Sequence, residues 1–413
     1  MDDKPRNLRT MLAEAKDTSE LMVDLAYAAV YFSDPDMAEE VGELEAKMTE
    51  LVDDMRTLCV IAVRSPKEAS AMSSVLQVIS AIERIANDAV NIGRVVTHKL
   101  GIPSQLLADL ADAEEVSHRV LVSDGSHMAH RPLAALELPV AAGMRIMAVR
   151  RDRLWITELS GDDVLVPGDV LFLRGAPAGI GRLRQLAAAP QWNPPEVAEE
   201  TAMTDLDRAV DVLVEMKNLS EVAVGLAYSA IVLSDRGLVA EVKHLEDRLD
   251  EMKDRLELWV LRAAAEVAAE NIDPGPLRGL LHLAEAAEDI GDQAQQMVAL
   301  IEDQADLHPI LGLALGESDE VVMKVPVAAG SPCDGRTLAE LQLDIEPGFD
   351  VLAIRRGGGY LYRPGGLVAL QPDDELITVG PEEGRPLMAL RCGWLFEDDD
   401  ETGTVELVPT TAR

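Results

Sequence analysis

The sequence is poor in cysteine and in basic residues, and each shortage excludes a class of protein. Only three of the 413 residues are Cys, widely spaced and without a CxxC pair. This argues against a disulfide framework or a zinc site and for reduced thiols. The 37 basic residues, nine of them Lys, are outnumbered by 74 acidic ones, for a formal net charge of −37. Because phosphate backbones are bound by clustered Lys and Arg, we expect no nucleic-acid partner, and the charge equally disfavours adsorption to anionic lipid.

Long apolar runs are also missing. Even the richest apolar segments are interrupted by Asp, Glu or Arg, so we expect no direct insertion into a membrane. The first residues, MDDKPR, contain no apolar signal-peptide core. The sequence therefore predicts a cytoplasmic protein that reaches a membrane surface only through a partner. Its acidic residues are spread along the whole chain, which suits a solvated surface in high salt.

The chain contains an internal duplication. LAYAA at residues 25–29 matches LAYSA at 226–230, an offset of 201 positions. After an apparent four-residue insertion near Asn271, the offset becomes 205, and it relates Glu83 to Glu288 and Pro167 to Pro372. Length alone suggests two to four domains, and the repeat indicates that each copy contributes the same set.

The first half of each copy has the spacing of helices. Apolar residues recur three and four positions apart, and Pro66 stands where proline suits a first helical turn. Three antiparallel helices with short connections predict a bundle. The predicted helices cover about 8–33, 36–64 and 66–98 in the first copy and about 205–234, 237–270 and 275–303 in the second.

The second half of each copy changes to short strand-like runs punctuated by glycine. In the first copy these runs cover 119–122, 145–150, 154–157 and 169–173, with a short helix at 131–136, and the second copy repeats the order. This predicts a small α+β module in each copy. Residues 187–203 have the composition of a semi-rigid linker, and 394–413 are predicted to be an acidic disordered tail.

Two known families are similar to these segments. The run ERIANDAVNI at 83–92 resembles the third-helix signature of PhoU, a three-helix-bundle family associated with metal binding and with regulation of phosphate transport. DGRTLAEL at 334–341, VLAIRRGG at 351–358 and PDDEL at 372–376 resemble the TrkA C-terminal (RCK-C) domain, a ligand-sensing module of regulators of potassium channels and transporters. The resemblance implies an α+β multidomain fold, with PhoU-like bundles at 1–103 and 204–308, RCK-C modules at 104–186 and 309–393, a linker at 187–203 and a tail at 394–413.

The PhoU-like helices carry the candidate metal ligands. Glu288 and Asp292 are four residues apart, so they stand on one helix face, and they match the family's E-x-x-x-D motif. In the first copy Glu83 is followed by Asn87 and Asp88, where an amide replaces one carboxylate. A divalent metal at these residues is one interpretation. The other is that the acids line a solvated groove of an acidic protein.

Paired arginines are the candidate ligand-binding residues. Arg150 and Arg151 end one predicted strand, and Arg355 and Arg356 end its equivalent. Paired guanidinium groups suit phosphate, and the RCK-C resemblance implies an anionic or nucleotide effector near such strand ends, for which a cyclic dinucleotide is the candidate. The other interpretation is that they balance nearby acids. His118, His127 and His130 fit no closed zinc pattern, so we expect surface or turn histidines.

No catalytic motif is present, and the GxGxxG nucleotide-binding segment that usually precedes RCK-C is missing, so we expect no enzyme and no Rossmann cofactor. The resemblance instead implies a regulatory subunit of a membrane cation transporter or channel, for potassium or magnesium, that senses a small-molecule effector. The RCK-C modules are expected to pair within one chain as a pseudo-dimer or between chains in a homodimer. The alternative is a PhoU-like metal-binding adaptor that regulates phosphate uptake.

Overall fold

The structure is a computed structural model that describes residues 7–110, 115–152, 154–192, 204–269, 273–302, 307–316, 318–398 and 405–410. The chain divides into two compact units, each assembled from both copies. A helical unit comprises Met1–Ser117 and Asn193–Ser318, and a sheet unit comprises His118–Trp192 and Asp319–Arg413. Elements that alternate along the chain are therefore grouped by kind.

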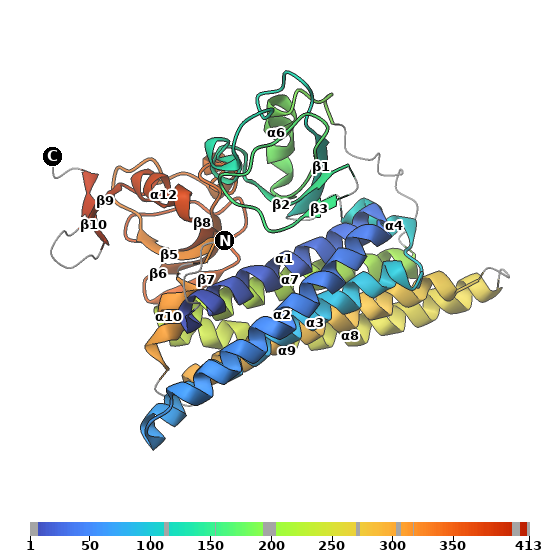
Figure 1. Ribbon diagram of the computed structural model, residues 1–413, viewed down its shortest axis with the longest axis horizontal. Coiled ribbons are helices and arrows are strands. Elements are labelled where there is room, and N and C mark those ends of the chain that lie inside the picture. The colour runs from blue at the N-terminus through green and yellow to red at the C-terminus, as the bar shows by residue number, and fades with distance from the viewer. Residues whose placement is uncertain are drawn as a thin grey trace. The chain divides into compact units, whose positions relative to one another are not determined.

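The helical unit is built from long helices (Figure 1), several of which begin at a capping residue. Asn7 and Thr10 form a capping box at the first helix. Asp34 and Ser65 cap the second and third helices by accepting hydrogen bonds from backbone N–H groups, and each is followed directly by a proline. The first helix of each copy ends at a serine in the left-handed conformation. The helices are α1 (Leu8–Phe32), α2 (Pro35–Ala62), α3 (Pro66–Thr97), α7 (Asp205–Leu233), α8 (Arg236–Ala269) and α9 (Arg278–Glu302), the last preceded by the 3₁₀ turn Gly275–Leu277.

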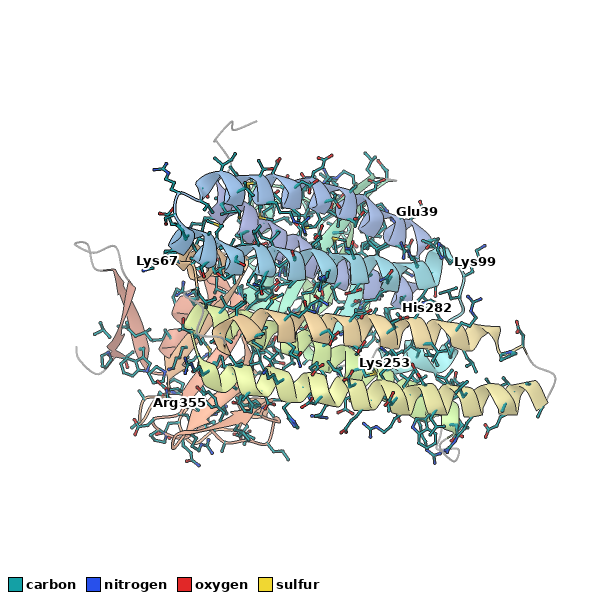
Figure 2. The ribbon with its side chains drawn as sticks, turned by 90° about the horizontal axis from the view of Figure 1, so that it is seen from below. Glu39, Lys67, Lys99, Lys253, His282 and Arg355 are labelled. Atoms are coloured by element: carbon teal, nitrogen blue, oxygen red, sulfur yellow. The ribbon has the colours of Figure 1, made fainter. Side chains whose placement is uncertain are left out.

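The two predicted three-helix bundles pack against each other. Helices α1, α2 and α3 contact one another, as do α7, α8 and α9, and α3 packs along α9 (Figures 1 and 2). Two short helices, α4 (Ser104–Asp109) and α10 (Pro309–Leu315), pack on α7 and on α1 with α7, respectively. The division between the units falls after Ser117 and Ser318, so the predicted RCK-C modules, which began at 104 and 309, included helices that pack with the bundles.

Helix α7 bears on the expectation that no segment inserts directly into a membrane. Among the described residues it is the one helix long and apolar enough to do so by length and composition, but 67% of its apolar window is buried. It packs along α8 and α9. Burial in the helical unit accounts for its composition.

The sheet unit holds two four-stranded sheets with the same strand order. In the first the order is β1-β4-β2-β3, and in the second it is β5-β8-β6-β7. A register shift occurs between Ile146 and Ala148 in one sheet and between Val351 and Ala353 in the other, at positions related by the repeat. The strands are β1 (Val116–Leu121), β2 (Met144–Arg151), β3 (Leu154–Ile156), β4 (Val170–Gly175), β5 (Glu320–Pro326), β6 (Asp350–Arg356), β7 (Gly359–Tyr362) and β8 (Glu375–Pro381).

Short helices cover each sheet and complete its core. Phe172 and Phe349 are fully buried, one in each module. In the second module the core joins β5, β6 and β8 to a helix near the C-terminal end, through Val325, Ile354 and Met388. The short helices are α5 (Leu138–Ala142), α6 (Ile180–Leu186), α11 (Leu338–Leu341) and α12 (Arg385–Arg391), with 3₁₀ turns at Leu133–Ala135, Pro177–Gly179 and Glu382–Gly384.

The prediction of a disordered tail from residue 394 is wrong for the described part of that segment. Strands β9 (Trp394–Asp398) and β10 (Val405–Pro409) pair antiparallel. Trp394 and Leu407 pack on the core of the second module, and the Trp394 indole N–H donates to the carbonyl oxygen of Pro326 at 2.6 Å. Burial of Trp394 and Leu407 stabilises this hairpin despite the acidic composition of the segment. Of the predicted linker, residues 193–203 lie outside the described residues.

Candidate functional site

The second PhoU-like bundle gathers acidic side chains between α8 and α9. Lys253, labelled in Figure 2, donates from Nζ to Glu288 Oε2 at 2.8 Å. Glu288 also shares a hydrogen bond with Asp250, and its pKa is raised, mainly by burial and against the effect of Lys253. Glu288 is therefore bonded to one basic and one acidic side chain of α8, Lys253 and Asp250.

Glu246 and Asp292 form a second contact in the same bundle. Glu246 is buried and accepts a hydrogen bond from Gln295 Nε2 at 2.6 Å. Burial, followed by the charges of Asp250 and Asp292, raises the pKa of Glu246 to about 7, and a hydrogen bond with Asp292 favours the protonated form further. Glu246 and Asp250 were not among the predicted ligands, because nothing in the sequence shows which face of α8 meets α9.

The predicted ligands of the first copy are separated by the fold. Glu83 accepts hydrogen bonds from the two terminal guanidinium nitrogens of Arg56, at 3.2 and 2.5 Å, and so contacts α2. Asn87 is exposed, whereas Asp88 is buried. In the parts of the chain that the structure describes, no group of three or more His, Cys, Asp or Glu residues is placed to hold a metal ion.

Asp88 instead belongs to the interface between α3 and α9. Burial, and next the charge of Asp289 on α9, raise the pKa of Asp88 to about 7, against a hydrogen bond from Asn91 and the charge of Arg84. Glu285 adds a smaller effect in the same direction as Asp289. Two acids from different copies thus lie near each other in a poorly solvated place, which favours the protonated form of Asp88.

At the equivalent position of the α3–α9 interface, the repeat places residues of different charge. The 205-residue offset converts Asp289 to Arg84 and Asp88 to Gln293. Arg84 Nη1 donates to Gln293 Oε1 at 3.4 Å and to Gln296 Oε1 at 2.8 Å. The backbone arrangement is repeated, but the charges are not.

A second pair of contacts links α1 to α7 symmetrically. Lys16 Nζ lies 5.2 Å from the ring centroid of Tyr228, and Lys217 Nζ lies 5.4 Å from that of Tyr27. Both lysines are buried, and each also pairs with the glutamate four residues later, at 2.7 and 2.9 Å. The tyrosines belong to the matching LAYAA and LAYSA segments, so that repeat marks a contact between the copies.

Two of the four predicted anion-binding arginines bind buried aspartates. Arg151 donates from Nε and Nη2 to the two carboxylate oxygens of Asp169, both at 2.8 Å. Arg356 does the same to Asp374, at 2.7 and 2.6 Å. The Asp169 side chain is fully buried and also accepts a hydrogen bond from the N–H of Val166. Burial alone would raise the pKa of Asp169, but the hydrogen bonds from Arg151 and Val166 outweigh burial and leave this pKa lowered. This geometry assigns Arg151 and Arg356 a structural role.

Of the other two arginines, Arg150 lies beside aromatic rings and Arg355 has an aromatic register partner. The guanidinium of Arg150 lies 5.7 Å from the ring centroids of both Trp155 and Phe172. Arg355, labelled in Figure 2, bonds Glu375 at 2.8 Å and lies opposite Tyr360 in the strand register. The predicted arginine pairs are therefore divided, because successive residues of a strand point to opposite faces.

The two modules of the sheet unit contact each other through equivalent glycines. An added Cβ at Gly143 would collide with the carbonyl oxygen of Asp344, and one at Gly348 would collide with that of Pro139. The 205-residue offset exchanges these two contacts. On one side, Arg145 adds ion pairs to Glu320 at 3.0 Å and Asp319 at 3.3 Å. The two modules are therefore in contact within this unit.

His118 departs from the expectation of surface histidines. It is buried, its Nε2 lies 3.1 Å from Arg184 Nη1, and its ring is edge-on to Trp192 at 5.6 Å between centroids. Burial, followed by the charges of Arg184 and Arg119, lowers the pKa of His118 to about 4. It is a neutral packed histidine at neutral pH.

These features define a duplicated protein in which two helical bundles and two small sheet modules each form an internal pair. Family models identify both kinds of domain. The PhoU domain matches residues 12–96 and 213–301, and the TrkA-C domain matches residues 118–188 and 322–389. The chain is a tandem repeat of PhoU and TrkA-C domains, which confirms the predicted resemblance and the α+β multidomain fold.

Solved structures of both kinds are similar to the chain at low identity. PhoU from Pseudomonas aeruginosa is 13% identical, with a TM-score of 0.36 over 71% of this chain and 93% of that one. The GsuK channel bound to NAD is also 13% identical, with a TM-score of 0.18 over 76% of this chain and 64% of the channel. The GsuK RCK domain is 13% identical, with a TM-score of 0.17 over 76% of this chain and 78% of that one. No curated protein matches the chain.

Proposed function

We propose that this chain is a cytoplasmic, non-enzymatic regulatory subunit of a membrane transporter or channel for a cation, potassium or magnesium. The observation that carries the proposal is the contact of two TrkA-C domains through Gly143 and Gly348. A small effector that binds one arrangement of this contact more tightly than another shifts the population of arrangements. The PhoU domains then offer the surface through which the change reaches the transporter, which makes the coupling allosteric.

The effector site that fits best comprises Arg150 and Arg355 with the aromatic residues near them in each sheet. Arg150 lies against Trp155 and Phe172, and Arg355 lies opposite Tyr360, whose ring stacks on Tyr362 at 5.3 Å. Aromatic rings stack on nucleobases and guanidinium groups bind phosphate, so this chemistry suits a cyclic dinucleotide. Arg151 and Arg356 fit this role less well, because their guanidinium groups are bound to the buried carboxylates of Asp169 and Asp374.

Calorimetric titration of the purified chain in high salt tests the effector. We expect saturable binding of a cyclic dinucleotide, weakened at least tenfold by Arg355→Gln combined with Tyr360→Ala. Arg336→Gln, an exposed arginine of the same domain, is the matched control and should bind as the wild type does. Absence of saturable binding to every cyclic dinucleotide and cation tried would remove the sensing part of the proposal.

Deletion of the gene tests the transported ion. The proposal predicts altered uptake of potassium or magnesium and altered growth when that cation is limiting. Complementation by the wild-type chain should restore uptake. An unchanged cation flux together with altered phosphate uptake would contradict the proposal and support the alternative below.

The alternative is a PhoU-like metal-binding adaptor that regulates phosphate uptake. It rests on the acidic side chains Glu246, Asp250, Glu288 and Asp292 of the second bundle, because carboxylates are ligands of hard cations, although the described residues place no group of three or more of them to hold a metal ion. It predicts a bound metal that is lost in Glu288→Ala combined with Asp292→Ala. Elemental analysis of the purified variant and wild type, with Asp205→Ala combined with Asp211→Ala on α7 as control, distinguishes the two functions.

A further inference from the structure

The second TrkA-C domain contains two cysteines in contact. The sulfur atoms of Cys333 and Cys392 are 3.9 Å apart, and both residues are fully buried although 59 positions separate them. Cys333 lies in the segment after β5, and Cys392 follows α12. The backbones are also joined, because Cys333 N–H donates to the carbonyl oxygen of Arg391 at 3.2 Å and Ala328 N–H donates to that of Cys392 at 2.9 Å.

The first TrkA-C domain shows that packing alone does not require these two thiols. The repeat places Met128 where the second copy has Cys333, and Ala187 where it has Cys392. Met128 and Ala187 are fully buried as well. One large and one small apolar side chain therefore fill the same place that two cysteines fill in the second copy.

We propose that Cys333 and Cys392 form a site of reversible oxidation by peroxide. The Cys333 thiolate attacks one oxygen of hydrogen peroxide, the O–O bond breaks, and the products are a Cys333 sulfenic acid and, after protonation, water. Cys392 sulfur then attacks the Cys333 sulfur, its proton leaves with the sulfenic hydroxyl as a second water, and a disulfide remains. Two thiols lose two electrons and two protons, and one peroxide is reduced to two waters.

The surroundings assign the two roles. The Cys392 thiol donates a hydrogen bond to Cys333, and this bond, more than the nearby charges of Arg391 and Arg336, lowers the pKa of Cys333 against the effect of burial. The pKa of Cys392 is raised by the same bond and by burial. Cys333 is therefore the thiol that reacts with peroxide, and Cys392 is the one that resolves the sulfenic acid.

The disulfide would connect the segment after β5 to the base of the C-terminal hairpin. Gly393, next to Cys392, accepts hydrogen bonds at its carbonyl oxygen from the backbone N–H and the hydroxyl of Thr410, at 3.0 and 3.1 Å. Because both thiols are fully buried, peroxide reaches them only when the surrounding segments separate locally. Once formed, the crosslink restricts the separation of α12 and the hairpin from the sheet.

Peroxide treatment of the full chain tests the proposal. We expect free thiols to fall from three to one, a mass loss of about 2 Da, and a tryptic crosslink between the Cys333 and Cys392 peptides that dithiothreitol reverses. Cys59, buried on α2 with its pKa raised by burial, is the internal standard and should remain reduced. Loss of Cys59 at the same rate, or a crosslink that forms only in denaturant, would overturn the proposal.

Variants test the assigned roles. In Cys392→Ala, a sulfenic-acid reagent such as dimedone should label Cys333, whereas Cys333→Ala should leave Cys392 unlabelled. Equal labelling in the two variants would contradict the assignment. Because a single substitution can disturb the core, Cys333→Met combined with Cys392→Ala reproduces the first copy. It should keep the wild-type melting temperature and lose the response to peroxide. These measurements need no transporter, so they stand or fall independently of the proposed function.

Discussion

The two TrkA-C domains carry the same arginine–aspartate pair, whereas the two PhoU domains face each other with different charges. Arg151 with Asp169 and Arg356 with Asp374 agree in register and in bonded atoms. At the α3–α9 interface, Arg84 contacts Gln293 at one position, whereas Asp88 and Asp289 lie near each other at the position that the repeat makes equivalent. The arginine–aspartate pair inside each TrkA-C domain is repeated, whereas the charges at the α3–α9 interface have diverged.

This difference shows what a tandem duplication permits. In a symmetric homodimer, one substitution changes both sides of the interface at once. In this chain each side is encoded separately, so Arg84 meets Gln293 while Asp88 meets Asp289. The same reasoning applies to Cys333 and Cys392, whose equivalents are Met128 and Ala187. One copy can acquire a chemical property that the other lacks.

Removal of the buried aspartates should have the largest effect and should be equal in the two copies. Asp169→Ala and Asp374→Ala each leave a guanidinium and a backbone N–H without their acceptor, at a cost of about 3 kcal/mol to the affected domain. Hydrogen exchange followed by mass spectrometry should show faster exchange in the domain that carries the substitution. A loss of stability in only one of the two variants would show that the two domains do not depend equally on this aspartate.

The glycine contact between the TrkA-C domains should be the next most sensitive. Gly143→Ala and Gly348→Ala place a methyl group against a carbonyl oxygen of the other domain, which should cost about 2 kcal/mol. Gly125→Ala and Gly330→Ala are matched controls, because they also have positive φ angles but nothing within 4 Å of the added Cβ. Exchange at residues 139–143 and 344–348 should rise in the first pair only. Equal effects in both pairs would mean that backbone strain, rather than the contact between the domains, causes the loss of stability.

The acidic side of the α3–α9 interface should make stability depend on pH. The pKa of Asp88 is raised to about 7 from an unfolded value of about 4. Stabilisation from its protonated form is therefore complete below about pH 4 and is lost as the pH rises to about 7. Asp88→Asn should stabilise the PhoU pair at pH 8, by on the order of 1 kcal/mol, and flatten the pH profile of α3 exchange. An unchanged profile would show that Asp88 is not the titrating group.

The smallest effects should come from the ion pairs of the predicted metal ligands, and they should differ between copies. Glu83→Gln loses the half-exposed pair with Arg56 and should destabilise by about 0.5 kcal/mol. Glu288→Gln loses Lys253 but also relieves the contacts with Asp250 and Asp292, so its effect should be near zero. Chemical denaturation monitored by circular dichroism measures both. A larger loss for Glu288→Gln would mean that the acids of the second bundle stabilise it.

The sequence predicted the elements better than their contacts, for a physical reason. Caps and apolar spacing are local, so Ser65 with Pro66 marked the start of α3, and the bundles were found. Partners in space are not local. Nothing near Arg151 in the sequence reveals that Asp169 occupies its guanidinium, and nothing near Cys333 reveals Cys392. The hairpin of β9 and β10 was missed because its acidic composition concealed two short strands that pack through Trp394 and Leu407.

The central claim is that an effector acts on the contact between the two TrkA-C domains. Hydrogen exchange of the full chain at residues 139–143 and 344–348, with increasing cyclic dinucleotide in high salt, measures it directly. The account predicts a saturable change in both segments together, with a shifted midpoint in Gly348→Ala and no shift in Gly330→Ala. No change at any concentration, in a chain whose other segments exchange as a folded protein, would contradict it.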